Sequence, residues 1–176
     1  MNKIIALTIL SLVIFTSCKK VNTSNTSGTS SIDNTIYKAT TYFAYGFSFS
    51  KAGKVATTAT PGPDIVLYVN NDTGTPRLTL QASNLNNSFS KVGDYVDAAS
   101  AETAFKNLLT VGSVLWTGQA DPVRANQVWL YRTNDEQYVK IRIVSVINET
   151  RSSVAFGQIT FEWVFQPDGT STFPAK

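Results

Sequence analysis

Large side chains alternate with small or polar ones along much of this chain, and a period of two is typical of β-strands. Between residues 37 and 49 the large side chains fall on odd positions, at Phe43, Tyr45, Phe47 and Phe49. Successive side chains of a strand point to opposite faces. We therefore expect residues 37–49 to form one strand with a packed face.

Two further strands are predicted in the middle of the chain. Residues 64–69 are a short apolar run between Pro63 and a polar turn at 70–74, which favours a strand covered on both sides. Apolar side chains alternate again over 78–82. Residues 84–93 are polar enough to predict a loop.

The last third of the chain has the clearest strand pattern. Residues 128–132 and 138–147 are predicted to form a hairpin around a four-residue turn at 133–136. A further strand is expected over 154–166, with four large side chains on one face: Ile159, Phe161, Trp163 and Phe165.

One helix is predicted between residues 100 and 112, with Ser100 as its N-cap and Gly112 at its end. Apolar residues recur there at helical spacing: Ala101, Ala104, Phe105, Leu108 and Leu109. The predicted fold class is therefore mostly β, an antiparallel, sandwich-like arrangement with one short helix.

The N-terminus carries an apolar segment that is too short to span a membrane. Residues 4–15 are almost all apolar, whereas a spanning helix needs about 20 such residues. We interpret residues 1–17 as a signal peptide. Residues 18–35 are rich in Ser, Thr and Asn, which predicts a flexible tether leading to a single domain over 36–176.

Cys18 is the only cysteine, and it directly follows the small residues Thr16 and Ser17. Small residues followed by cysteine at this place resemble the lipobox of bacterial lipoproteins, with Phe15 where leucine is usual. The resemblance implies that Cys18 is lipidated and held on the membrane by two or three acyl chains. The alternative is an ordinary secretory signal with an incidental cysteine.

Charge and composition narrow the function. The chain has 15 basic and 12 acidic residues without a dense basic stripe, which predicts no nucleic-acid partner. It has no histidine, so Ser-His-Asp and Cys-His catalytic arrangements and imidazole metal ligands are excluded. We expect no enzymatic activity and no metal site. A hydrolase using Glu149 and Glu162 is the least favoured alternative.

The predicted hairpin supplies a candidate ligand-binding face. A four-residue loop would pair Tyr131 with Tyr138 and Trp129 with Lys140, and it would place Arg142 on the same face. Such a face suits a flat anionic ligand, because rings stack and cations meet carboxylates. The alternative is a solvent-side ladder of cross-strand pairs. A shift of the register by one residue would break the grouping.

The same region carries a family resemblance. Residues 128–143 and 155–166 resemble the HmuY-like family of haem-binding bacterial cell-envelope lipoproteins. The matching elements are Arg132-Thr133, Tyr138-Val139-Lys140 and the strand from Gly157 to Trp163, together with Asp64-Ile65-Val66-Leu67, where Pro63 replaces the family's tryptophan.

The resemblance runs loosely from about 36 to 173 and implies an HmuY-like fold and haem as a possible cofactor. Family members bind haem through pairs of His or Met side chains, which the mature chain lacks. By chain order the ligand would lie between loops 83–97 and 117–127. Tyr95 is the residue there that can ligate ferric haem iron.

Together these features predict a lipid-anchored, non-catalytic binding module for haem or another flat or apolar ligand. The alternative is a structural or interaction lipoprotein that binds an envelope protein or a glycan through surface aromatics. The expected place is the outer membrane with the domain facing the periplasm, because Lys19 rather than Asp follows Cys18 and no acidic run comes after it.

Overall fold

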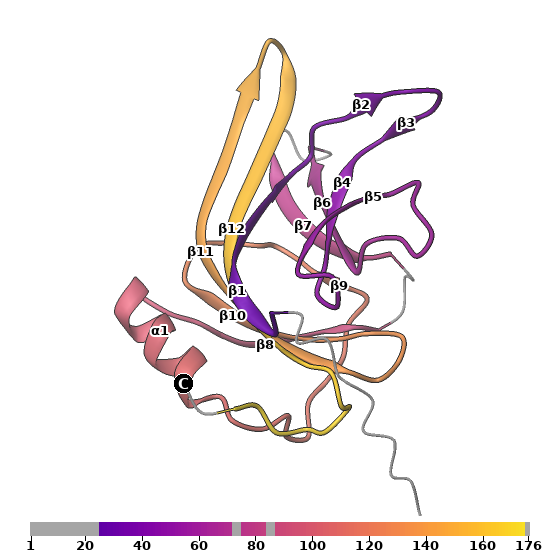
Figure 1. Cartoon of the computed structure of the whole chain (residues 1–176). Coiled ribbons are helices and arrows are strands. Elements are labelled where there is room, and N and C mark those ends of the chain that lie inside the picture. Colours follow the sequence, from indigo (N-terminus) through magenta and orange to yellow (C-terminus); the bar gives the residue numbers. More distant parts are fainter. Residues whose placement is uncertain (1–24, 72–74, 84–86, 175–176) are drawn as a thin grey trace, which may run out of the picture.

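The computed structural model describes residues 25–71, 75–83 and 87–174. Two five-stranded antiparallel sheets face each other, and most buried apolar side chains lie between them (Figure 1). The first sheet has the order β1 (Ser27–Asp33), β12 (Val154–Gln166), β11 (Tyr138–Arg151), β10 (Gln127–Arg132) and β8 (Phe89–Asp94). The second has the order β5 (Gly53–Ala56), β4 (Tyr45–Ser48), β6 (Ile65–Asn70), β7 (Arg77–Ala82) and β9 (Gln119–Ala120). The prediction of a mostly β, sandwich-like fold is confirmed.

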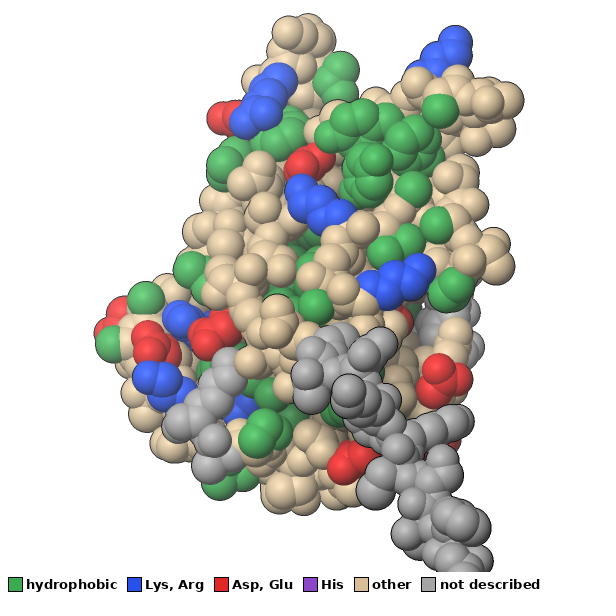
Figure 2. Space-filling model, in the orientation of Figure 1, with side chains coloured by type: hydrophobic (Ala, Val, Ile, Leu, Met, Phe, Trp, Pro, Cys, Tyr) green, Lys and Arg blue, Asp and Glu red, His purple; other side chains and the backbone are tan. Residues whose placement is uncertain are grey.

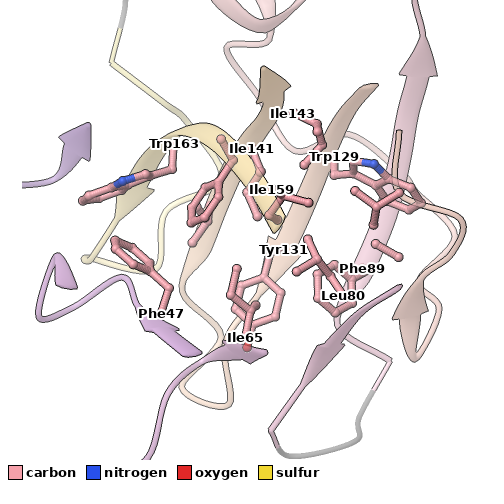
Figure 3. Packing of buried hydrophobic residues seen from close by; sticks show 14 of the residues in the cluster. Phe47, Ile65, Leu80, Phe89, Trp129, Tyr131, Ile141, Ile143, Ile159 and Trp163 are labelled. Atoms are coloured by element: carbon pink, nitrogen blue, oxygen red, sulfur yellow. The ribbon is translucent and has the colours of Figure 1, made fainter. Parts of the chain in front are cut away.

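The core between the sheets is built from large rings and aliphatic side chains (Figure 3). At one end Phe47 of β4 meets Phe161 and Trp163 of β12, with ring centroids 5.3 and 5.4 Å apart. Trp129 lies at the other end of the same layer (Figure 3). The alternation expected for β7 and β12 therefore puts their apolar faces into one core.

A third layer covers the outer face of the first sheet. The helix α1 (Ala98–Asn107) packs there through Phe105, which forms one buried cluster with Val128, Leu130 and Val164. The N-cap is Asp97, whose carboxylate accepts a hydrogen bond of 2.7 Å from the backbone N–H of Ser100. The predicted bounds of this helix were thus wrong at both ends, since it starts before residue 100 and ends at Asn107. Within the described ranges no helix is long and apolar enough to cross a membrane.

The strand β1 lies inside the segment predicted to be a flexible tether. It pairs with β12 along its whole length, from Ser27 opposite Val164 to Asp33 opposite Gln158. Ile32 is its only fully buried side chain, so the strand is held mainly by backbone hydrogen bonds, which the side-chain pattern does not reveal. The folded domain begins before residue 36, and the predicted boundary is wrong.

The single strand predicted over 37–49 is broken into three short ones: β2 (Tyr37–Lys38), β3 (Tyr42–Phe43) and β4. Only Phe47 and Phe49 enter the core, because β2 and β3 turn away as a separate two-stranded pair. A strand, β8, also occupies much of 84–93, where a loop was predicted, because it pairs with β10 at the edge of the first sheet.

The hairpin of β11 and β12 is the longest element and projects beyond the rest of the first sheet (Figure 1). Ser152 and Ser153 form its turn with positive φ angles of 46° and 65°, as a two-residue hairpin turn requires. A bulge between Ile143 and Ser145 marks the point beyond which most side chains of β11 are exposed.

Candidate functional site: the Trp129 groove

The hairpin turn between β10 and β11 sets the register of the predicted site. Its loop has three residues, 134–136, because the N–H of Thr133 bonds to the carbonyl of Gln137 and the N–H of Glu136 bonds back to the carbonyl of Thr133. Glu136 has a φ of 55°, which is typical of a type I turn followed by a bulge. Arg132 therefore pairs with Tyr138, one residue away from the predicted pairing.

This shift divides the predicted aromatic and basic face between the two sides of the sheet. Trp129 and Tyr131 point into the core between the sheets. Tyr138 and Lys140 lie on the opposite side, under α1 and the C-terminal segment. The prediction that these side chains share one face is wrong, because a slip of one residue exchanges the faces of a strand.

Each basic residue of that face already has a structural partner. Lys140 is fully buried, and its ammonium donates to the carbonyls of Phe105 and Leu108 at 2.9 and 3.0 Å. Arg142 donates to Glu162 at 2.8 Å across the sheet. Lys140 thus holds the last turn of α1 to the sheet.

The two carboxylates of the hydrolase alternative lie far apart. Glu162 sits opposite Arg142, whereas Glu149 lies seven residues further along β11. A strand rises about 3.4 Å per residue, so about 24 Å separates the two positions. Glycosidase carboxyl groups lie within about 10 Å of each other, which rules this pair out.

Tyr95, the predicted iron ligand, packs on the helix side of the first sheet. It belongs to the layer of Phe105 and Leu130, and its phenol lies over Gly93. Trp129 points to the opposite side of the same sheet. Tyr95 therefore does not share a site with Trp129.

The two loops expected to hold a ligand do lie side by side. Phe89 and Thr117 exchange two backbone hydrogen bonds of 2.9 and 2.7 Å, which join the predicted 83–97 and 117–127 segments. Between them is an open groove of about 580 Å³, which we call the Trp129 groove. Its lining residues come from β8, β9, β10 and the segments beside β9: Lys91, Thr117, Gly118, Gln119, Asp121 and Trp129.

The groove combines the small exposed part of the Trp129 indole, which is 3% exposed, with one charge of each sign. The ammonium of Lys91 lies 5.7 Å from the ring centre of Trp129 and 2.7 Å from a carboxylate oxygen of Asp94. That contact, with a hydrogen bond from Gln127, lowers the pKa of Asp94. Asp121 pairs with Arg77 at 3.1 Å, so its charge is balanced outside the groove.

The lining does not fit haem iron as a set of axial ligands. It offers an amine, hydroxyl, amide and carboxylate groups, whereas haem proteins use imidazole, thioether, thiolate or phenolate. The size falls within the range of small-molecule pockets. Lys91, Thr117 and Asp121 were not singled out in the sequence, because only the folded chain brings them to Trp129.

A second exposed feature is a group of aromatic rings at β2, β3 and β4. The rings of Tyr37 and Phe43 stack at 5.6 Å, and Tyr45 meets them edge-on at 5.2 and 5.4 Å. Tyr42 is 68% exposed, under the ammonium of Lys38. We call Tyr37, Tyr42, Phe43 and Tyr45 the ring surface. Figure 2 shows hydrophobic side chains gathered in the region of these strands.

No known family model matches this chain, and no curated protein matches it. The resemblance to the HmuY-like family therefore stays a prediction from the sequence.

Proposed function

We propose that the chain is a lipid-anchored, non-catalytic binding protein of the bacterial cell envelope, and that the Trp129 groove is its ligand site. The main support for this proposal is that the 83–97 and 117–127 segments lie together next to Trp129, with the ammonium of Lys91 beside the indole. This is the place that the family resemblance assigns to a ligand, although the residues that line it differ.

The chemistry of the groove favours a flat, largely apolar ligand that carries an anionic group. Such a ligand would lie against the edge of Trp129, and its anionic group would meet the ammonium of Lys91. Tetrapyrroles have this shape and charge. Haem itself would be held there without axial ligands from the lining residues.

The membrane anchor rests on Cys18, which lies outside the described residues. Eight residues separate it from Ser27, the first residue of β1, so the Cα atoms of Cys18 and Ser27 can lie at most about 32 Å apart. Ser27 pairs with Val164, far along β12 from the turn at Ser152 and Ser153, so the tether would join the domain far from the hairpin tip. Mass spectrometry of the mature N-terminal peptide decides whether Cys18 is acylated.

Metal-free protoporphyrin IX should bind wild-type protein and quench its tryptophan fluorescence. Replacing Lys91 by alanine is expected to weaken this binding about tenfold, because a charge-assisted contact with a propionate is lost. The matched control is Lys106→Ala, which also removes an exposed lysine that pairs with a carboxylate, 2.6 Å from Glu102, but lies on α1. Titrations followed by fluorescence give the three dissociation constants.

Equal affinities for wild type and Lys91→Ala would place the ligand elsewhere. Haemin supplies a second check through its Soret band. We expect Tyr95→Phe to leave the haemin spectrum unchanged, since the phenol lies on the helix side of the sheet. A band shift that depends on Tyr95 would contradict the proposed site.

The ring surface favours a second candidate function, the docking of an envelope protein. Exposed tyrosines that contact each other are typical of interface hot spots. The double variant Tyr37→Ala/Tyr42→Ala should lose chemical cross-links to its partner in envelope membranes. Tyr68→Ala is the control, because Tyr68 is 50% exposed and lies outside the ring surface. Binding to purified glycans that requires Tyr37 and Tyr42 would instead identify a glycan as the partner.

A further inference from the structure

A second cavity lies at the end of the sandwich where β4, β6 and the β10–β11 turn come together. It encloses about 490 Å³, and we call it the Asp64 cleft. Polar groups make up about half of its wall: the hydroxyls of Ser48 and Thr133, the amides of Asn134 and Gln137, and the carboxylates of Asp64 and Asp135. Tyr131 and Phe165 of the first sheet also line it.

Asp64 is fixed firmly in this wall. Its carboxylate accepts a hydrogen bond of 2.7 Å from the backbone N–H of Phe49, and its backbone N–H donates to the carbonyl of Phe47. Its own carbonyl accepts from the phenol of Tyr131 at 2.9 Å and from the N–H of Ser83 at 3.2 Å. Three of these contacts fix the backbone of Asp64 and join both sheets, and the fourth orients its carboxylate.

The electrostatics of the cleft select the charge of its ligand. Burial raises the pKa of Asp64, and the charge of Asp135 adds to the effect. Among the described residues that line the cleft there is no lysine or arginine. An anionic ligand would therefore meet repulsion from Asp64 and Asp135. The ammonium of Lys51, which donates to the carbonyl of Pro61 in the cleft wall at 3.3 Å, offsets only part of this repulsion. The Trp129 groove differs from the cleft in that its lining includes a cation, Lys91.

The remaining groups are partly engaged within the fold, since the Thr133 hydroxyl accepts from the N–H of Gln137 and the Gln137 amide donates to the carbonyl of Pro167. Their further donors and acceptors suit a ligand that itself both donates and accepts hydrogen bonds. Hydroxyls do both, amides supply a donor and an acceptor, and carboxylates accept strongly. Tyr131, Phe165 and Pro63 add apolar contact area. A sugar ring carries hydroxyl groups on its rim and C–H groups on its faces, and it matches this distribution.

We propose that the Asp64 cleft binds a neutral sugar residue, with Asp64 as the acceptor for its hydroxyl groups. This site is separate from the groove and does not rest on the function proposed there. The carbonyl of Thr26, just before β1, accepts a hydrogen bond of 2.7 Å from the N–H of Phe165. Phe165 lines the cleft, so the cleft lies close to the start of β1. The sugar can come from free saccharide or from the headgroup of a glycolipid.

The test is a titration of the full domain with methyl glycosides of common neutral hexoses and N-acetylhexosamines, followed by two-dimensional NMR. We expect saturable shifts of the side-chain amides of Asn134 and Gln137. Asp64→Asn keeps an acceptor for Phe49 and should weaken the affinity about tenfold, because a charge-assisted hydrogen bond becomes a neutral one. Asp135→Ala, in an exposed turn, provides a second variant with little risk to folding.

Glu149→Gln is the matched control, since this carboxylate is exposed near the tip of the long hairpin. Lys91→Ala should also leave sugar binding unchanged, so failure of the groove and failure of the cleft can be told apart. Vesicles with and without a neutral glycolipid distinguish a headgroup from free saccharide. The proposal would be overturned if no glycoside or glycolipid produced a shift, or if both cleft variants bound the glycoside as tightly as wild type. Calcium and putrescine serve as cationic probes in separate titrations, and shifts with these cations alone would also overturn it.

Discussion

Replacing Lys140 by methionine is expected to lower the free energy of unfolding by about 3 kcal/mol, although the side-chain volume is nearly kept. The ammonium donates to the carbonyls of Phe105 and Leu108 in the last turn of α1, and the side chain is fully buried. Methionine would leave both carbonyls without this donor, and an unsatisfied buried group costs about 1–3 kcal/mol. Urea unfolding followed by circular dichroism measures the loss.

The control for this prediction is Lys106→Met on the same helix. Lys106 pairs with Glu102 at 2.6 Å, but both side chains are about half exposed, so the loss should stay below about 0.5 kcal/mol. Lys140→Met would also remove two cation–π contacts, because the ammonium of Lys140 lies 4.9 Å from the ring centre of Phe105 and 5.5 Å from that of Phe173. If both variants unfolded at the same urea concentration, Lys140 would not be the anchor of the helix.

The role of Lys140 shows what the sequence could and could not predict. Alternation correctly indicated the strands of the last third, because a period of two is a local property. It could not show which residues face each other across the hairpin. A loop of three residues instead of four, closed by Glu136 in a left-handed conformation, moved Lys140 from the predicted ligand face to the underside of α1.

The errors near the N-terminus have a related cause. Most residues of β1 are polar and have small side chains. The strand forms because its backbone pairs with the edge of β12, and no side-chain pattern in residues 27–33 predicts this pairing. Phe43 continues the alternation of Phe47 yet leaves the core, because the chain folds back between β2 and β3. Tyr45, at the start of β4, packs against the rings of that pair and not in the core. Here tertiary pairing overrides a local signal.

The two cavities also differ in how far the sequence could predict them. The meeting of the 83–97 and 117–127 segments was predicted from chain order in a resembling family, and the structure brings them together. The Asp64 cleft was not predicted. Asp64 was placed at the start of a strand, and nothing in the sequence indicated that the turn carrying Asn134 and Asp135 would lie across from it.

Gly46→Ala is expected to lower the free energy of unfolding by about 2–3 kcal/mol, which is more than the replacement of an exposed glycine would. A Cβ at this position would press on the backbone carbonyl of Ile65 and come within 2.6 Å of the side chain of Pro63. Neither neighbour can move freely, since Phe47 pairs with Ile65 and also accepts a hydrogen bond from the N–H of Asp64. The backbone must shift, and such overpacking typically costs about 1–3 kcal/mol.

Gly112→Ala is the matched control, because a Cβ there would have no neighbour within 4 Å, and its effect should stay within about 0.5 kcal/mol. Because Pro63 and Asp64 belong to the wall of the Asp64 cleft, Gly46→Ala should also reduce glycoside affinity, while the groove retains its porphyrin. Thermal unfolding with both ligands separates these effects. Unchanged stability and unchanged glycoside affinity in Gly46→Ala would mean that the close approach of β4 to β6 does not shape the cleft.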